Sequence, residues 1–583
     1  MTLRRRRLLR GLTLGILTGY LPPIPLGLAA EDVYALGRRG NVRIIHQTDT
    51  HAQYRPVYFR EPSVNIGVGP ATGRPPHLVG PAFLDHFAIK PGSAMAYATT
   101  CLDFAEAAHR FGMLGGFAHA KTLIDRLRAE AGENASMLLD GGDLWQGSWA
   151  AHASHGIAMV ELSNLLGVEA MTSHWEMTYG EKQFRANLAA FKGTYLAQNV
   201  FLTDDAAFNG APAFDAKSGR VFQPYLVKEL GGRRIAIIGQ AFPYQPIAHP
   251  QRFTPDWTFG VRDRELQAVV DEVRGKQRAD AVVLLSHNGM DVDLKLASRV
   301  RGIDVILGGH THDCTPLPSV VAGAGGRTLV TSGGSHGKFL AVLDLEVGPG
   351  KVSGVHYDLL PVFPALLKPD PAVGRKVAEI AGRDRAMLDE TLATAEELLY
   401  RRGNFTGTMD QMICNALLRE TDAEIALSPG FRWGPSLLPG QALTMEFLLA
   451  HTAMTYPSVY VQTMTGAALK GVMEDVCDNL FNPDPYVQQG GDMVRVGGME
   501  YACSPDARMG NRISAMTLRD GRPIAADKNY KVAGWASVSR PQDGKLVWEV
   551  VASALRGGLL ARPLVEDRIT IQGVARNPGL MPA

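Results

Sequence analysis

The sequence predicts a two-domain α/β protein, and three observations support this prediction. From about residue 40 to residue 345, short apolar runs rich in β-branched residues alternate with helix-forming stretches, which is typical of βαβ units. A second mixed set of strand and helix signals occupies residues 395–583. The chain of 583 residues is long enough for two to four domains, each with its own core.

The composition excludes several classes of protein. Hydrophobic residues make up 46% of the chain and charged residues 20%, as in ordinary globular proteins. A net charge of +1 gives no strong field for nucleic acid or an anionic membrane. The 5 cysteines contain no CxxC pair, which excludes zinc-finger and thioredoxin motifs, and their spacing leaves any disulfide pairing open.

Residues 1–30 have the features of an export signal. Four arginines at positions 4–7 precede an apolar stretch that ends in Ala29-Ala30, a small-residue cleavage site. Prolines at 22, 23 and 25 make this stretch a poor membrane-spanning helix. Arg5-Arg6-Arg7-Leu8-Leu9-Arg10 fits a twin-arginine signal, with an ordinary Sec signal as the alternative. We therefore expect a periplasmic protein.

Five short polar clusters each follow an apolar run that reads as a buried strand. They are Asp49-Thr50-His51 after residues 42–46, Gly141-Gly142-Asp143 after 137–139, Ser173-His174-Trp175-Glu176 after 168–171, His287-Asn288 after 282–285, and Gly308-Gly309-His310-Thr311-His312 after 303–307. In an open α/β sheet, ligands bind outside the carboxyl ends of the strands. The sequence thus brings two aspartates and five histidines to one sheet edge.

The other elements follow in order along the chain. Residues 116–131 and 263–275 show the apolar spacing of helices, and residues 328–347 read as a hairpin that closes the first domain. The Pro- and Gly-rich stretch between Arg55 and Thr100 has no clear period and predicts a functional insertion. Residues 369–394 read as a polar bridging helix.

The polar clusters predict two metal ions. A single buried His or Asp is usually structural, and Asp143 alone could be the N-cap of a helix starting near Leu144. Seven such residues at five strand ends are not explained in that way. Carboxylates and imidazoles without cysteine suit Mn, Fe, Zn, Ni or Co.

In this order the motifs resemble those of the calcineurin-like metallophosphoesterases. The resemblance implies a four-layer β-sandwich flanked by helices over residues 31–365. It also implies one metal held by Asp49, His51, Asp143 and His312, and a second held by Asp143, His174, His287 and His310, with Asp143 bridging. Two such ions would share a hydroxide as the nucleophile.

Residues 395–583, after a linker at 366–394, resemble the C-terminal α/β domain of the 5′-nucleotidases. Gly403-Asn404-Phe405 and the segment from Ser428 to Arg432 stand at the places of that domain's substrate-binding segments.

The third cluster departs from the nucleotidase pattern, which is Gly-Asn-His-Glu followed by an aromatic residue and Asp. His174 stands at the metal-binding Asn, but Trp175 replaces the catalytic His and Thr178 replaces the Asp that orients it. A sugar alkoxide needs a proton donor in order to leave, whereas a thiolate, with a pKa near about 8.5, does not. The cluster therefore predicts a sulfur leaving group; the alternative is that Trp175 is only a packing residue.

Together with the Tyr58-Phe59-Arg60-Glu61-Pro62-Ser63 insertion, this pattern resembles the thiosulfohydrolases of the periplasmic Sox system for thiosulfate oxidation. The resemblance implies a dimanganese hydrolase whose metal-bound hydroxide removes the terminal sulfonate, as sulfate, from an S-sulfonated cysteine persulfide. The substrate cysteine would lie on the flexible C-terminal arm of a carrier protein, the SoxYZ complex. The expected catalytic residues are Asp143, His174, Trp175 and Arg432, the last binding sulfonate oxygens unless it forms a surface salt bridge.

Two other functions remain open. A periplasmic 5′-nucleotidase or cyclic-nucleotide phosphodiesterase would need aromatic residues to stack a base, for which Phe405, Phe431 and Trp433 are candidates. A non-enzymatic scaffold that docks the carrier is the second alternative. His336 is expected to form a hydrogen bond with a neighbour, and Cys314 to be a small buried hydrophobe.

Overall fold

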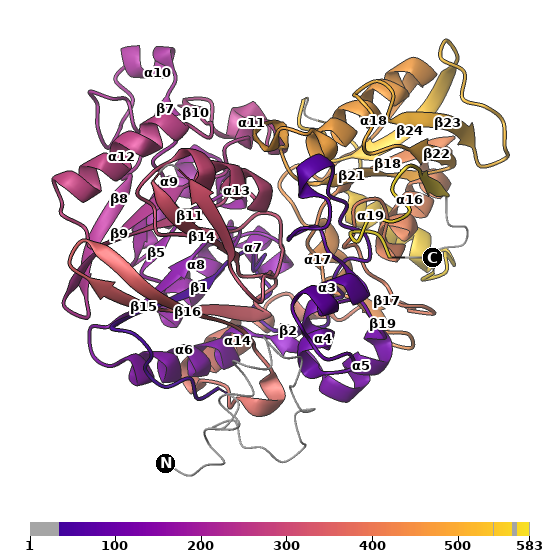
Figure 1. Ribbon diagram of the computed structural model, residues 1–583. Helices are drawn as coiled ribbons and strands as arrows, with labels where there is room; N and C mark the ends of the chain where they lie inside the picture. Colours follow the sequence, from indigo (N-terminus) through magenta and orange to yellow (C-terminus); the bar gives the residue numbers. More distant parts are fainter. Residues whose placement is uncertain (1–33, 324, 540–541, 563–567, 582–583) are drawn as a thin grey trace.

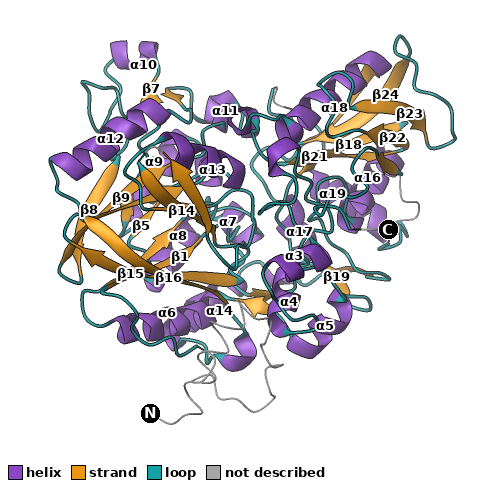
Figure 2. Cartoon of the chain, in the orientation of Figure 1, coloured by secondary structure: helices purple, strands orange, loops and turns teal. Residues whose placement is uncertain are grey.

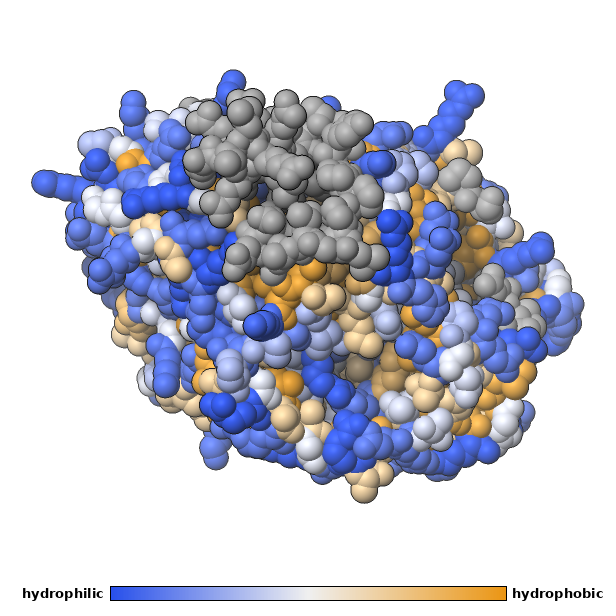
Figure 3. Space-filling view, turned by 90° about the horizontal axis from the view of Figure 1, so that it is seen from below, coloured by the Kyte–Doolittle hydropathy of each residue, from blue (hydrophilic) through white to orange (hydrophobic). Residues whose placement is uncertain are grey.

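The computed structural model describes residues 34–323, 325–539, 542–562 and 568–581 (Figure 1). The predicted signal peptide, residues 1–30, lies outside this part of the chain. In the described ranges, no helix combines the length and the apolar character that a membrane crossing requires. In the coloured part of Figure 3, most side chains are hydrophilic, with smaller apolar patches among them.

The N-terminal domain contains two six-stranded sheets. The first has the order β16 (Lys351–Pro361), β15 (Phe339–Gly348), β1 (Val42–Gln47), β4 (Ser136–Asp140), β5 (Ala170–Met171) and β6 (Thr194–Tyr195). Strands β1, β4, β5 and β6 are parallel, whereas β15 and β16 are antiparallel to their neighbours. The carboxyl ends of β1, β4 and β5 therefore meet at one edge.

The expectation that one sheet edge carries all five polar clusters is wrong, because the last two clusters follow strands of the second sheet. Its order is β13 (Ser319–Gly323), β14 (Gly326–Ser332), β12 (Val305–Gly308), β11 (Ala281–Ser286), β9 (Arg233–Gln240) and β8 (Tyr225–Leu230). Strands β9, β11, β12 and β14 are parallel.

The two sheets pack face to face and are covered by helices, as Figure 2 shows. Ile44 and Leu139 of the first sheet share one buried cluster with Ile237, Val283 and Leu307 of the second. The outer face of the first sheet carries α6 (Phe117–Ala131), α8 (Ile157–Leu166), α9 (Glu181–Ala190) and α14 (Pro371–Ala381), and that of the second carries α12 (Asp263–Gly275) and α13 (Met290–Arg299). The predicted four-layer architecture is confirmed.

Helix α12 illustrates why the sequence patterns were informative. Leu266, Val269, Val270 and Val273 follow the i, i+3, i+4, i+7 spacing of one helical face, and all four are buried. Acidic residues occupy its first turn and Arg274 its last, where each sign is favoured by the helix dipole. Both predicted helices are present, and α6 begins one residue later than expected.

The hairpin predicted at residues 328–347 is wrong. The segment contains two strands, β14 and β15, but they belong to different sheets. Each pairs instead with its other neighbour along the chain, β14 with β13 and β15 with β16. An apolar β pattern shows where a strand lies but not which strand it pairs with.

The predicted bridging helix at 369–394 is also more divided than expected. The segment contains α14, α15 (Arg385–Leu388) and the strand β17 (Thr391–Thr394). Strand β17 pairs with β19 (Ala442–Thr444) in the C-terminal part of the chain. The domain boundaries at 365 and 395 stay a prediction.

The C-terminal domain is a second α/β unit, as predicted. One sheet has the order β20 (Val459–Thr465), β24 (Asn529–Trp535), β18 (Ile425–Gly430) and β21 (Asp492–Gly497), and a smaller one the order β23 (Ile513–Leu518), β22 (Met499–Cys503) and β25 (Ile569–Ile571). The helices packed against these sheets are α16 (Thr408–Thr421), α17 (Met445–Thr452), α18 (Gly466–Phe481) and α19 (Val547–Arg556).

The insertion between Arg55 and Thr100 lies between the two domains. It contains α3 (Gly80–His86) and α4 (Ala94–Thr99), drawn in indigo and purple beside the C-terminal domain in Figure 1. A buried ion pair between Glu61 and Lys338 ties it to the N-terminal domain. A bridge between Tyr58 and Ser436 ties it to the C-terminal domain.

Candidate metal centre

All seven residues expected to bind metal lie together in the structure. They form two buried groups, Asp49, His51, Asp143 and His312 in one, and Asp143, His174, His287 and His310 in the other. Within each group the candidate ligand atoms lie within 4.8 Å of one another. These two clusters are consistent with a dinuclear metal site.

Asp143 is the residue that the two groups share. Its Oδ2 lies 3.3 Å from His51 Nε2, 3.4 Å from His174 Nδ1 and 3.2 Å from His287 Nε2. No helix begins at Leu144, since α7 (Trp149–Ala153) starts five residues later, so the N-cap alternative for this aspartate is wrong. One carboxylate therefore faces histidines of both groups.

The turns that carry the ligands have an unusual backbone. Asp49, Asp143, His310 and His312 all have positive φ, between 51° and 76°. Such conformations cost of order 1–3 kcal/mol each in non-glycine residues and cluster at functional sites. A Cβ at Gly142 would approach His287 Nδ1 to 2.9 Å, so the Gly-Gly motif permits close contact between neighbouring strand ends.

Neighbouring polar groups orient several of these side chains. His287 Nδ1 donates a hydrogen bond to the Gly141 carbonyl at 2.6 Å, which leaves its Nε2 facing the carboxylates. Thr48 Oγ1 donates to Asp49 Oδ2 at 2.6 Å, and the Trp175 backbone N–H donates to Asp143 Oδ1 at 2.8 Å. These hydrogen bonds fix the orientation of the candidate ligand side chains.

Glu176 has a structural role that the sequence did not reveal. Its carboxylate accepts hydrogen bonds from the backbone N–H groups of Leu144 at 2.7 Å and His174 at 2.9 Å. It therefore joins the second polar cluster to the third. The only sequence signal was its place in the third cluster, two residues after His174.

Burial and neighbouring charges shift the pKa values of these side chains in opposite directions. Burial, together with the nearby Asp143 and against the opposing effect of His287, raises the pKa of Asp49 to about 6. Burial also acts on Asp143, but His287, His174 and His51 outweigh it and hold the pKa of that carboxyl well below its usual range. Burial lowers the pKa of His174 to about 4, whereas Asp143 and Asp49 overcome burial and raise that of His287 to about 10.

The donor set fits two divalent cations. His174 Nδ1 and His287 Nε2 are buried and have no hydrogen-bond partner within the described residues. Buried polar atoms without a partner are costly, and a cation held between them would satisfy both. Imidazole and carboxylate ligands together suit first-row divalent metals.

A cavity of about 690 Å³ opens beside the centre and is lined by both domains. Its lining includes several of the candidate ligand residues and the aromatic side chains of Trp175, Phe431, Trp433 and Tyr456. The rings of Phe431 and Trp433 stack on each other with centroids 4.1 Å apart. The third base-stacking candidate, Phe405, is buried in the C-terminal core against Phe481 and does not reach the cavity.

Arg432 also lines this cavity, so its place agrees with contact to a bound anion. Its Nη2 donates to the Gly491 carbonyl at 2.6 Å, and its Nε lies 3.5 Å from Asp492 Oδ1. Arg432 thus forms a salt bridge, as the alternative expected, but the pair is largely shielded from solvent, with exposed fractions of 11% and 0%. Its binding to sulfonate oxygens stays a prediction.

His336 and Cys314, which were not expected to bind metal, are placed as predicted. His336 Nε2 accepts a hydrogen bond from the Gly434 backbone N–H at 3.1 Å, which connects the two domains. Cys314 is buried among apolar side chains of the core between the sheets.

Comparison with known proteins agrees with this geometry. Residues 391–550 match the family described as 5′-nucleotidase, C-terminal domain. The trifunctional nucleotide phosphoesterase YfkN of Bacillus subtilis is 23% identical over 478 residues, which cover 74% of this chain and 31% of that protein. The chain thus spans about a third of that relative. The rat 5′-nucleotidase is 23% identical over 461 residues, 72% of this chain and 76% of the relative.

Two solved structures from Thermus thermophilus are similar over most of the chain. A 5′-nucleotidase precursor, 21% identical with a TM-score of 0.70 over 91% of this chain and 99% of that chain, shows the common fold. The sulfate thiohydrolase SoxB, in complex with glycerol, is 35% identical with a TM-score of 0.86 over 93% of this chain and 98% of that chain. With its dimetal-type centre and its 5′-nucleotidase C-terminal domain, the chain belongs to the SoxB family of 5′-nucleotidase-related metallophosphoesterases.

Proposed function

We propose that the protein is a periplasmic dimanganese hydrolase that removes the terminal sulfonate, as sulfate, from an S-sulfonated cysteine persulfide on a carrier protein. The observation that carries the proposal is the replacement of a catalytic His–Asp dyad by Trp175 and Thr178. The similarity to a sulfate thiohydrolase supports the same substrate class.

Neither replaced position holds a group that can protonate a leaving atom. The Trp175 ring packs edge-on against His249, with centroids 4.4 Å apart, and against Trp433 at 4.8 Å. Thr178 Oγ1 shares a hydrogen bond of 2.6 Å with Thr455 Oγ1. A thiolate leaves without protonation near neutral pH, whereas a sugar alkoxide needs help, so these contacts favour a sulfur leaving group.

The seven clustered Asp and His residues would hold the metal ions, with Asp143 between them. Bound there, two divalent ions would activate water near neutral pH and neutralise the charge of a tetrahedral anion. Arg432 would bind a sulfonate oxygen with its guanidinium, and the aromatic side chains that line the cavity would exclude bulk water from the reacting sulfur.

The aromatic residues give little support to nucleotide binding. A base is usually held between or upon exposed ring faces, but Phe431 and Trp433 already stack on each other at 4.1 Å. No base fits between rings in contact. An extended peptide arm does not require such ring faces, and the carrier we propose is a SoxYZ-type complex with a cysteine near the end of such an arm.

The test is mass spectrometry of a peptide with an S-sulfonated cysteine persulfide, incubated with manganese-loaded protein while released sulfate is measured. Loss of the sulfonate with AMP left intact is the expected result. Cleavage of AMP with the sulfonate intact would contradict the proposal and support the 5′-nucleotidase alternative. The Asp143→Ala variant is the control for contaminating activity.

A paired substitution tests the leaving-group argument separately. Trp175→His together with Thr178→Asp restores the dyad of the nucleotidase pattern and should raise phosphatase activity relative to sulfonate hydrolysis. Thr178→Asp alone is the matched control, because it adds the charge without the imidazole. An unchanged ratio of the two activities in the double variant would count against the argument.

A further inference from the structure

A turn of the C-terminal domain lies directly against one histidine of the metal centre. The turn covers residues 489–491, between η5 (Pro485–Val487) and β21, and Gly490 faces the ring of His310. A Cβ at Gly490 would stand 1.9 Å from His310 Nε2, 2.7 Å from Cδ2 and 3.1 Å from Cε1. Because the two carbons are nearly equidistant, that position lies straight ahead of Nε2. Only glycine permits this contact.

The contact determines which nitrogen of His310 can face the metal centre. Nε2 is buried and has no hydrogen-bond partner in the described part of the chain. Since main chain of the C-terminal domain covers it, Nδ1 is the nitrogen left to join Asp143, His174 and His287.

The ring of His310 is therefore fixed by packing and not by a hydrogen bond. The ring nitrogen of a metal-binding histidine that does not face the metal usually donates a hydrogen bond to a carbonyl or carboxylate, as His287 Nδ1 does to the Gly141 carbonyl. His310 has Phe242 against its ring, with centroids 4.3 Å apart, and Gly490 at its Nε2 edge. Packing of the turn against the ring thus orients His310, as a hydrogen-bond acceptor would in other metal-binding histidines.

Arg432 joins the same turn to the main chain of His310. Its Nη1 donates to the His310 carbonyl at 3.4 Å, and its Nη2 donates to the Gly491 carbonyl at 2.6 Å. The turn thus meets this residue at both its ring and its backbone.

We propose that Gly490 positions His310, so that the C-terminal domain takes part in retaining the metal ion bound by Asp143, His174, His287 and His310. This inference rests on the metal centre of the proposed function and not on the identity of the substrate. It makes Gly490 a positioning residue that acts through His310.

The test is the metal content of Gly490→Ala, measured by elemental mass spectrometry after gel filtration, together with manganese titration calorimetry. We expect the variant to lose one of the two ions, or to bind that ion about 10–100-fold more weakly. Gly491→Ala is the matched control. Its φ of +85° is close to the +75° of Gly490, but a Cβ there meets nothing within 4 Å. Backbone strain is therefore similar in the two variants, and only Gly490→Ala adds the clash with His310.

Two further measurements make the outcome specific. In a His310→Ala background, Gly490→Ala should cause no additional loss of metal, because the ring on which it acts is absent. Arg432→Gln, which removes the side-chain link between the turn and His310 without a clash, should weaken binding of the same ion, and it serves as the test if Gly490→Ala does not fold. Wild-type affinity for both ions in Gly490→Ala, or an equal loss in Gly491→Ala, would overturn the inference. A wild-type protein that binds fewer than two ions would instead contradict the metal centre itself.

Discussion

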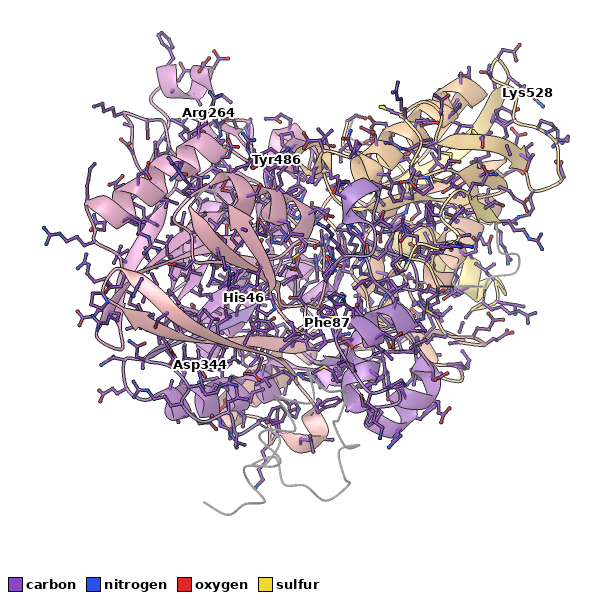
Figure 4. All side chains as sticks on the ribbon, in the orientation of Figure 1. His46, Phe87, Arg264, Asp344, Tyr486 and Lys528 are labelled. Atoms are coloured by element: carbon purple, nitrogen blue, oxygen red, sulfur yellow. The ribbon has the colours of Figure 1, made fainter. Side chains whose placement is uncertain are left out.

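His46, on strand β1 beneath the metal centre, should make the stability of the protein depend on pH. Its side chain is fully buried, and Figure 4 places it in the interior of the N-terminal domain. Neither ring nitrogen has a hydrogen-bond partner among the described residues, and burial lowers its pKa from 6.5 to about 3. Substitution His46→Leu removes the titrating group without breaking a hydrogen bond.

The sign and size of the effect follow from proton linkage. Because the pKa in the folded state lies below that in the unfolded state, the unfolded chain binds the proton first as the pH falls. His46 therefore destabilises the folded protein progressively from about pH 6.5 down to about pH 3. For these two pKa values, the loss at about pH 5 relative to about pH 7.5 is of order 2 kcal/mol.

Urea unfolding of the wild type and of His46→Leu at the two pH values measures this loss. The other buried histidines and the metal ligands are common to both proteins, so their contributions cancel in the difference. We expect the wild type to lose about 2 kcal/mol more than the variant between about pH 7.5 and about pH 5. Equal pH dependence in the two proteins would refute the reasoning, since it would mean that His46 does not titrate differently on folding.

Three further predictions concern the metal centre and the contact between the insertion and the N-terminal domain. Asp143→Ala and His174→Ala should both abolish turnover and lower the bound metal, measured by elemental analysis; activity in either variant would contradict the ligand assignment. Chelation should lower the melting temperature in calorimetry, because bound ions stabilise only the folded state, by about 2.7 kcal/mol at 100 times the dissociation constant. Lys338→Met leaves the buried carboxylate of Glu61 unpaired and should cost about 3–5 kcal/mol in urea unfolding, with much of it restored by adding Glu61→Gln; a loss below about 1 kcal/mol would mean the pair is not buried in solution.

The sequence was sufficient to predict which residues form the metal centre, because the end of a buried strand can be recognised from the few residues around it. Each ligand follows a buried run, and parallel strands bring such ends to one edge of a sheet, so Asp49 and Asp143 could be brought together without knowledge of the whole fold. His287 follows a strand of the other sheet, and its meeting with them depends on how the two sheets pack. Strand pairing was harder to predict. The sequence between Thr328 and Val347 shows two strands, and nothing local indicates that they belong to different sheets.

Contacts between the domains also could not be predicted, because nothing in the local sequence shows which distant segments meet. Gly490 and His310 are separated by a long stretch of chain, and a glycine pair in a loop is indistinguishable from an ordinary turn. Phe405 was a plausible aromatic for a binding site, but it is part of the C-terminal core. Which face of a segment meets the other domain is decided by packing between distant elements and not by its own pattern.

The end of the chain has a consequence for how substrates reach the cavity. After β25 the chain returns to the insertion, where the Asn65 N–H donates to the Gly579 carbonyl at 2.7 Å and the Met581 N–H donates to the Ser63 carbonyl at 3.0 Å. With the linker that contains α14 and the insertion itself, three separate segments hold the domains together. A single protease cut in the linker should therefore leave the two fragments associated. Swinging the domains apart would break all the other connections. Substrates would therefore enter through the cavity that both domains line, without a large rotation of one domain against the other.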